Sequence, residues 1–203
     1  METQYQLIKH FGPSIFKVKI PNNMLVEINN YIEDTISNNQ KIKKLDYGEG
    51  LAGDVTQEFK LEKKFAKEIG WLDFLATCVG KWIKLTTDKK ISKFLLLESW
   101  VVRQFKNEFN PIHWHTGHVS GAGFLKLPKS FGETIQNKNN IPYVGGSLEL
   151  IHGSKMFLSN SKFRIKPEVG DFYFFPNYLM HVVYPFRNTD EERRSISFNA
   201  KID

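Results

Sequence analysis

The stretch Pro111 to Phe124, PIHWHTGHVSGAGF, combines a β-type run with three of the six histidines of the chain. On a strand, residues i and i+2 point to the same face, so His113 and His115 can direct their imidazoles toward one point while Trp114 points away. Such a pair suits one metal ion, whose third ligand must come from a distant segment. The stretch therefore predicts a β fold with a metal site.

Short β-type runs separated by turn residues occupy the chain from residue 91 onward. Their number and spacing are typical of an all-β sandwich or barrel. The predicted strands are 93–106, 112–115, 119–127, 147–152, 163–166, 171–175, 181–184 and 194–200. Eight strands of this kind suit a two-sheet, cupin-like jelly roll, so we expect the core of the protein here.

The first 90 residues have a mainly helical periodicity instead. Alternation from Ser14 to Ile20 predicts an opening strand. Apolar residues at spacings of three and four then predict a helix that Asn22 or Asn23 caps. We expect a loop from Asn39 to Val55.

Helical spacing resumes from Phe59 to Ile83, with a bend at Gly70. We expect these helices to pack on the outside of one sheet. The fold class is thus α+β, mainly β. We expect a single domain, 1–203, in which 1–90 form a helical support region and 91–203 the jelly-roll core.

Composition narrows the class of protein further. A chain of 203 residues that is 41% hydrophobic can bury one sizeable core. Its only cysteine, Cys78, excludes an internal disulfide and favours a cytoplasmic location. No signal-peptide pattern and no apolar run of roughly 20 residues is present, so we expect no membrane partner. The net charge of +6 comes from scattered lysines with only five arginines, which argues against a nucleic-acid partner.

His181 is the candidate for the third metal ligand, because it opens the apolar strand HVVYPF after the turn PEVGD. His118, beyond Gly117, is an alternative partner for His115, although a turn residue is less firmly oriented. His10 and His152 have no partner in the pattern. We expect these two histidines to be structural or surface residues.

The C-terminal run EERRSISFNAK provides an independent signal. Alternation places Arg193 and Ser195 on one polar face, which could also be a solvent-exposed face. An Arg-x-Ser pair can bind a carboxylate through two parallel hydrogen bonds from the guanidinium and one from the hydroxyl. Arg193 follows His181 by 12 residues, so we expect it on the neighbouring antiparallel strand, facing the same cavity.

Three motifs, HWH, PEVGDFYFFPNYLMHVVYP and RRSISFN, together resemble the double-stranded β-helix core of the 2-oxoglutarate- and iron(II)-dependent oxygenases. The chain is most similar to a group related to prolyl hydroxylase-like enzymes, in which His-x-His is followed by SG, a strand and a proline, as in HVSGAGFLKLP. The resemblance covers the β-rich second half and, more loosely, FGPSIFKVKI with the helix after it.

This resemblance implies that His113, His115 and His181 hold iron(II), and that Arg193 with Ser195 binds the far carboxylate of 2-oxoglutarate. The implied catalytic residues are the three histidines and Arg193. The implied reaction is a dioxygenase reaction in which O2 hydroxylates a C–H bond of a small molecule or of a peptidyl residue such as proline. Most of the superfamily has a carboxylate where His115 stands, which leaves the identity of the metal open.

Two other classes of protein fit parts of the pattern. One is a three-His cupin-type dioxygenase or isomerase that does not use 2-oxoglutarate, for which Arg193 and Ser195 would have no purpose. The other is a non-catalytic jelly-roll binding module. The sequence does not determine the oligomeric state. The long polar connection from Lys129 to Tyr143 is predicted to be a lid.

Overall fold

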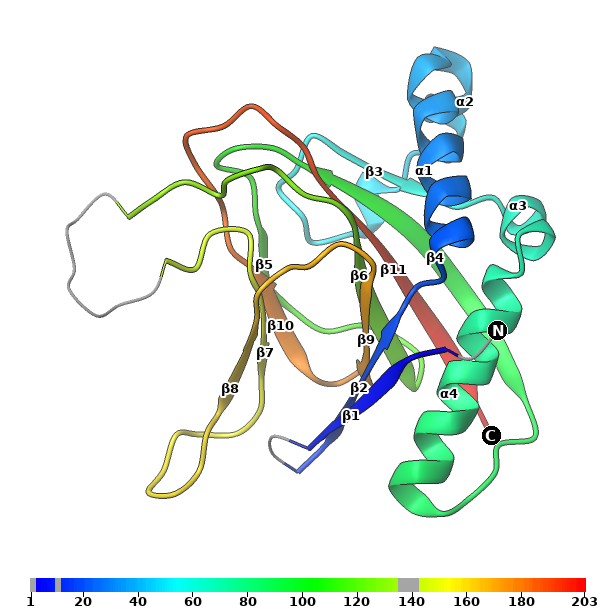
Figure 1. Cartoon of the computed structure of the whole chain (residues 1–203), viewed down its shortest axis with the longest axis vertical. Helices are drawn as coiled ribbons and strands as arrows, with labels where there is room; N and C mark the ends of the chain where they lie inside the picture. Colours follow the sequence, from blue (N-terminus) through cyan, green and yellow to red (C-terminus); the bar gives the residue numbers. More distant parts are fainter. Residues whose placement is uncertain (1–2, 10–11, 135–142) are drawn as a thin grey trace.

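The computed structural model describes residues 3–9, 12–134 and 143–203 (Figure 1). Its helices are α1 (Asn22–Ser37), α2 (Asn39–Leu45), α3 (Lys63–Glu68) and α4 (Trp71–Thr87), with a 3-10 turn at Gly48–Gly50. Its strands are β1 (Tyr5–Lys9), β2 (Ser14–Lys19), β3 (Gln57–Lys60), β4 (Phe94–Gln104), β5 (Asn110–His113), β6 (Val119–Lys126), β7 (Leu148–Ile151), β8 (Lys162–Ile165), β9 (Asp171–Pro176), β10 (Met180–Val183) and β11 (Arg193–Ile202).

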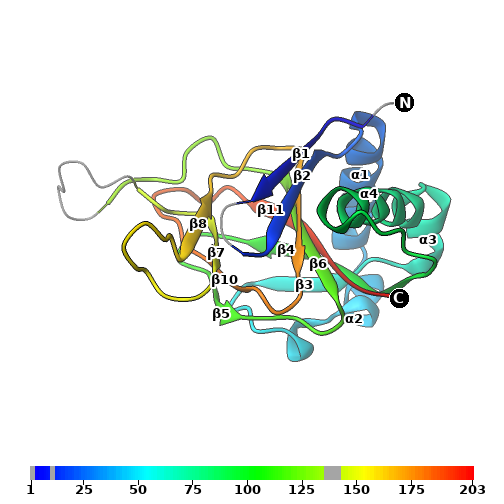
Figure 2. The same ribbon diagram turned by 90° about the horizontal axis from the view of Figure 1, so that it is seen from below.

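These strands form two antiparallel sheets. The large sheet has the order β1-β2-β9-β6-β11-β4-β3, and the small sheet has the order β5-β10-β7-β8. The helices lie on the outer side of the large sheet, and the small sheet lies on its other side (Figures 1 and 2). The predicted jelly roll with helices packed on one sheet is therefore confirmed.

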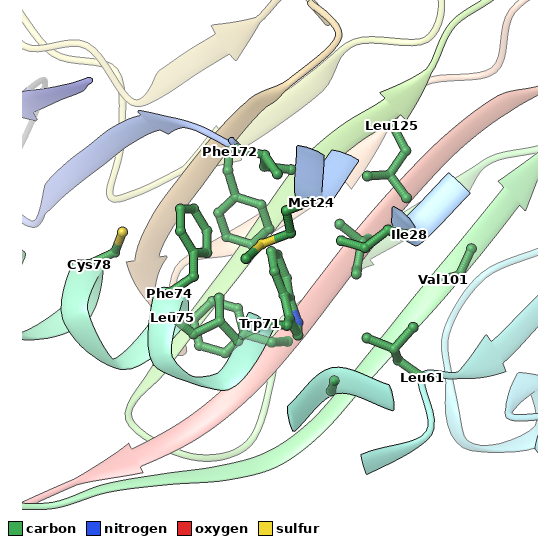
Figure 3. Packing of buried hydrophobic residues seen from close by; sticks show 14 of the residues in the cluster. Met24, Ile28, Leu61, Trp71, Phe74, Leu75, Cys78, Val101, Leu125 and Phe172 are labelled. Carbon is green, nitrogen blue, oxygen red and sulfur yellow. The ribbon is translucent and has the colours of Figure 1, made fainter. Parts of the chain in front are cut away.

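A first apolar core joins the helices to the large sheet (Figure 3). Trp71 of α4 is completely buried, and its ring meets Phe172 of β9 edge-on with centroids 5.5 Å apart. Phe172 in turn lies directly over β6, where a Cβ on Gly123 would come within 2.2 Å of its ring. The glycines of the motif SGAGF are therefore needed because an aromatic ring occupies the space of their side chains.

A second, smaller core fills the space between the two sheets. Adjacent residues of β6 belong to different cores: Phe124 packs into this second core and Leu125 into the core between the helices and the large sheet. Leu148 and Leu150 of β7 are residues of the small sheet that pack into this second core. A strand alternates its side chains between faces, so a strand of the large sheet can be buried on both.

Two predictions for the first half of the chain are wrong. Residues 39–45 form α2 and not a loop, because the Asn38 side chain accepts hydrogen bonds from the backbone N–H groups of Gln40 and Lys41. Phe59 and Lys60, the start of the predicted helical segment, belong to strand β3 and not to a helix, because the backbone of β3 pairs with β4, with Phe59 opposite Val101. The support region thus contributes strands as well as helices to the large sheet.

Smaller corrections concern helix ends and the N-terminal strand. Helix α1 begins at Asn22 with Pro21 at its N-cap position, so neither predicted asparagine caps it. Gly70 precedes α4 with a φ of 74°, which is the left-handed region and agrees with the predicted bend. Strand β1 was not predicted; it pairs with β2 at the edge of the large sheet.

From the spacing of Arg193 and His181 we expected β11 to lie beside β10. This prediction is wrong. Strand β11 lies between β6 and β4 in the large sheet, whereas β10 belongs to the small sheet. The intervening residues 184–192 cross from one sheet to the other, so the two strands face each other instead of pairing.

None of the described helices combines the length and the apolar character needed to span a membrane.

Replacing Phe172 by alanine should lower the free energy of unfolding by about 3–5 kcal/mol, because a completely buried ring leaves a cavity. Chemical denaturation measures this change. The matched control is Phe157→Ala at a ring that is 93% exposed, for which we expect a change within about 0.5 kcal/mol. Equal effects of the two substitutions would contradict this description of the core.

Candidate functional site

Three imidazoles gather where the small sheet faces the large one. His113 of β5 and His181 of β10 are direct partners in the antiparallel pairing of these strands. His115 follows β5, and Asn177 fixes its backbone on both sides, accepting from its N–H at 3.0 Å and donating Nδ2 to its carbonyl at 3.0 Å. One nitrogen from each ring lies within 4.8 Å of the others.

Backbone carbonyls determine the tautomers of two of these rings. Nδ1 of His113 lies 2.7 Å from the carbonyl oxygen of Pro111, and Nδ1 of His181 lies 3.0 Å from that of Leu179. A carbonyl oxygen only accepts, so Nδ1 carries the proton in both rings. The lone pair on each Nε2 is consequently available to a metal ion.

Burial keeps all three rings neutral, which is the form that binds metals. It lowers the pKa of His115 to about 2, with the neighbouring His181 and His113 adding to the effect. It lowers the pKa of His181 to about 3. The pKa of His113 is also lowered by burial, against a smaller opposite effect of its bond to Pro111.

His115 shows most directly that these residues fit a metal ion. Its Nδ1 is buried and has no hydrogen-bond partner among the described residues. A buried polar atom without a partner is costly, and a bound cation would supply the missing interaction.

The other histidines lie outside this cluster. The side chain of His118 is exposed, and its Nδ1 lies 2.7 Å from the carbonyl oxygen of Ile202 in β11. The structure thus brings His113, and not His118, together with His115 and His181. His152 is exposed, and His10 lies outside the described residues.

Arg193 and Ser195 project from β11 into the same cavity as the three histidines. The guanidinium is buried; its Nε donates to the carbonyl oxygen of Gly146 at 3.0 Å and its Nη1 to Oγ of Ser195 at 3.3 Å. Burial lowers the pKa of Arg193 to about 10, so it stays charged at neutral pH. None of the carboxylates in the described part of the chain pairs with it, which leaves this cation ready for an anionic ligand.

The cavity lies between the two sheets and has a volume of about 40 Å³. Much of its wall is apolar, with contributions from Trp100, Val102, Leu148 and Val183. An apolar wall limits the access of water to the polar groups inside and strengthens their electrostatic interactions.

Glu58 and Asn110 are polar residues that line the cavity and that the sequence patterns did not indicate. Asn110 faces the cavity because the pairing of β5 with β10 is irregular: Asn110 lies opposite Val183 and His113 opposite His181. Two residues of β5, Pro111 and Ile112, therefore stand opposite one residue of β10, Val182, as in a β-bulge. No local pattern in the sequence indicates such an irregularity.

Burial also raises the pKa of Glu58 to about 7, with the nearby Asp46 carboxylate adding to the shift and a hydrogen bond from Asn110 opposing it. Glu58 therefore takes up a proton more readily than an exposed glutamate does.

The predicted lid, Lys129 to Tyr143, falls largely on residues 135–142, which lie outside the described residues. Near its start, the backbone N–H of Lys129 donates to the Glu191 carboxylate. Its role as a lid stays a prediction.

Comparison with known proteins now identifies the class. Residues 98–199, half of the chain, match the family described as "Putative 2OG-Fe(II) oxygenase". The matched region runs from β4 to β11 and contains the three histidines, Arg193 and Ser195. The chain belongs to this family. A search of curated proteins finds no match.

Solved structures of low sequence identity share the fold. A prolyl-4-hydroxylase from Pseudomonas putida aligns with a TM-score of 0.57 at 15% identity, covering 96% of this chain and 91% of its own. The collagen prolyl hydroxylase of Paramecium bursaria Chlorella virus-1, solved with 2-oxoglutarate, gives 0.54 at 14% identity, covering 97% and 94%. HygX from Streptomyces hygroscopicus, solved with nickel, 2-oxoglutarate and hygromycin B, gives 0.56 at 13% identity, covering 98% and 82%.

The protein is therefore an enzyme, a 2-oxoglutarate-dependent non-haem iron dioxygenase with iron(II) as cofactor and 2-oxoglutarate as cosubstrate. The predicted family, enzyme class and cofactors are confirmed. The two alternatives that do without 2-oxoglutarate, the cupin-type enzyme and the non-catalytic module, are set aside.

Replacing Glu58 by glutamine should stabilise the metal-free protein at pH 8 by up to about 3 kcal/mol, as a rise in pKa from 4.5 to about 7 implies. The unfolded chain releases this proton above pH 4.5 while the folded chain retains it to about pH 7, so Glu58 lowers stability as pH rises through this window. Urea unfolding at pH 4 and pH 8 measures the gain. A gain that is equal at both values of pH would contradict the assignment.

Proposed function

We propose that the enzyme hydroxylates a C–H bond of its substrate, with iron(II) held by His113, His115 and His181 and 2-oxoglutarate anchored by Arg193 and Ser195. The observation that carries this proposal is the buried, unpaired guanidinium of Arg193 in the cavity of the three-histidine cluster. The chemistry that the cofactor and cosubstrate supply in this family is oxidative decarboxylation of 2-oxoglutarate to succinate, coupled to hydroxylation of the substrate by O2.

Arg193 would hold the carboxylate of 2-oxoglutarate that is distant from its keto acid. Its Nη2 has no hydrogen-bond partner among the described residues, and Nη1 already contacts the Ser195 hydroxyl. The bond from Nε to Gly146 and the ring of Phe124, 5.2 Å from the guanidinium carbon, fix the orientation of the group. A pre-oriented guanidinium loses little entropy when it binds a carboxylate.

His115 stands where related enzymes have a carboxylate, and this substitution changes the charge of the site. Three neutral imidazoles leave the full +2 charge of the ion uncompensated by the protein. A dianionic cosubstrate would balance that charge. We therefore expect metal and 2-oxoglutarate to bind with positive coupling, each increasing the affinity for the other.

For the substrate we propose a prolyl or other peptidyl residue. The similarity of the fold to two prolyl hydroxylases supports this choice, although HygX, solved with hygromycin B, has the same fold. Fold alone does not determine substrate.

We also infer that the whole chain acts as one domain. Strands β2 and β3 of the first 90 residues pair directly with β9 and β4 of the jelly roll. The free, buried Cys78 supports a cytoplasmic location.

Replacing Arg193 by methionine should weaken 2-oxoglutarate binding by about 10- to 100-fold, because charge-assisted hydrogen bonds to the carboxylate are lost. Anaerobic titration of iron(II) and then 2-oxoglutarate into metal-free protein, followed by the visible absorption band of the chelate, measures this affinity. The matched control is Arg164→Met at an exposed arginine of β8 that pairs with Glu149.

The proposed clamp would be wrong if Arg193→Met bound 2-oxoglutarate as tightly as the control. If no band formed with unaltered protein that had bound iron, the proposed use of 2-oxoglutarate at this site would be wrong.

His181→Ala should weaken iron(II) binding by at least about 100-fold, since it removes one of three proposed ligands. His118→Ala should leave the affinity unchanged, because this ring lies outside the cluster and contacts Ile202. Calorimetric titration of iron(II) under anaerobic conditions compares them. Loss of binding in His118→Ala would instead support the alternative pairing of His118 with His115.

A further inference from the structure

Buried acidic side chains in the described part of the chain are, with one exception, paired with cations. Glu149 pairs with Lys162 and Arg164. The other two paired acids are Asp171, with Lys17 and Lys19, and Glu192, with Arg103 and Arg194. Such pairing is expected, because burial of an unpaired charge is costly.

Glu58 is the exception. Only 3% of its surface is exposed, and no lysine, arginine or histidine of the described residues forms an ion pair with it. Its single side-chain partner is neutral: Nδ2 of Asn110 donates to Oε1 across 3.4 Å, which is a long hydrogen bond. The carboxylate is thus under-compensated in the folded protein.

The backbone at Gly53 packs closely against the side chains of Glu58 and Asn110. A Cβ at Gly53 would lie 2.6 Å from Nδ2 of Asn110 and 2.8 Å from Oε1 of Glu58. The neighbouring Leu51 and Ala52 line the main cavity. The acid is therefore held in place at the wall of the cavity and cannot turn freely into solvent.

Glu58 and Arg193 line the same cavity from different strands of the large sheet. Glu58 lies opposite Val102 on β4, and Val102 lies opposite Ser195 on β11, so the three residues form one row across the sheet. With strands about 4.8 Å apart, Glu58 and Ser195 are separated by roughly 10 Å. Both buried charges without an ion-pair partner, Arg193 and Glu58, thus line the same cavity from different strands.

We propose that Glu58, supported by Asn110, recognises a positively charged nitrogen of the substrate, such as the ammonium of a lysyl or the guanidinium of an arginyl side chain. This inference rests on the proposed function, since it specifies the substrate of the same cavity. Arg193 binds the anionic cosubstrate and Glu58 the cationic substrate. Binding of that cation would give Glu58 the ion-pair partner that it lacks among the described residues.

The cavity wall favours this occupant over a neutral one. Apart from the proposed metal and 2-oxoglutarate ligands, the polar lining residues are Glu58, Asn110 and Ser197, and the rest of the wall is apolar. A long aliphatic side chain that ends in a cation matches an apolar wall with one acid at its end. Glu58 also lines a second hollow, together with Gly53 and Gln57.

The test uses capped amino acids as probes: N-acetyl-lysine and N-acetyl-arginine methylamides against the neutral norleucine and citrulline derivatives of similar shape. They are titrated into the anaerobic complex of full-length protein with iron(II) and 2-oxoglutarate. Isothermal calorimetry gives the affinity of each probe. The variant is Glu58→Gln, which keeps the acceptor for Asn110, and its matched control is Glu49→Gln, an exposed acid in the 3-10 turn Gly48–Gly50.

We expect at least one cationic probe to bind unaltered protein and Glu49→Gln about tenfold or more tightly than its neutral counterpart, and Glu58→Gln to lose this preference. Lack of any cation preference in unaltered protein overturns the proposal, as does a preference that persists in Glu58→Gln. The absorption band of the iron and 2-oxoglutarate chelate is recorded in the same samples. Its absence would count against the proposed function, whereas a normal band without cation preference would count against the role of Glu58 alone.

Discussion

Strand β11 is buried on both of its faces from Arg193 to Ala200, and this constraint organises the rest of the molecule. Ile196 and Phe198 point toward the helices and help to form the larger core. The alternate residues, including Ser195, point into the cavity between the sheets. Because β11 is paired on both sides, with β6 and β4, the cavity wall that carries Arg193 and Ser195, the proposed 2-oxoglutarate clamp, has little freedom to move.

The two adjacent arginines of β11 show how one strand serves stability and binding together. Arg194 contacts Glu33 and Asn29 of α1 as well as Glu192, and so ties the helical layer to the large sheet. Arg193 points the opposite way and finds no carboxylate among the described residues. The same residue type thus forms structural ion pairs on one face of the strand and lines the cavity, as the proposed anion-binding group, on the other.

The three clustered histidines lie on the small sheet and just after β5, whereas Glu58, Arg193 and Ser195 lie on the large sheet, so the cavity between the sheets is lined by both groups. His113 and His181 are fixed by strand pairing and by carbonyl groups of their own strands. Glu58 and Arg193 are fixed by strands of the opposite sheet. Burial of Glu58 with only a neutral partner among the described residues costs stability, as we expect if this residue serves binding.

The sequence by itself determined the strands of the second half and the candidate ligands, because alternation, turn residues and the His-x-His spacing are local patterns. It could not determine β3 or α2, since β3 depends on its pairing with β4 and α2 is a short, largely polar helix. Only the tertiary structure decided that β11 faces β10 from the other sheet, that His113 and not His118 joins the cluster, and that Glu58 is buried without a cation. These features depend on contacts between residues far apart in the chain, and burial and pairing arise only when the two sheets come together.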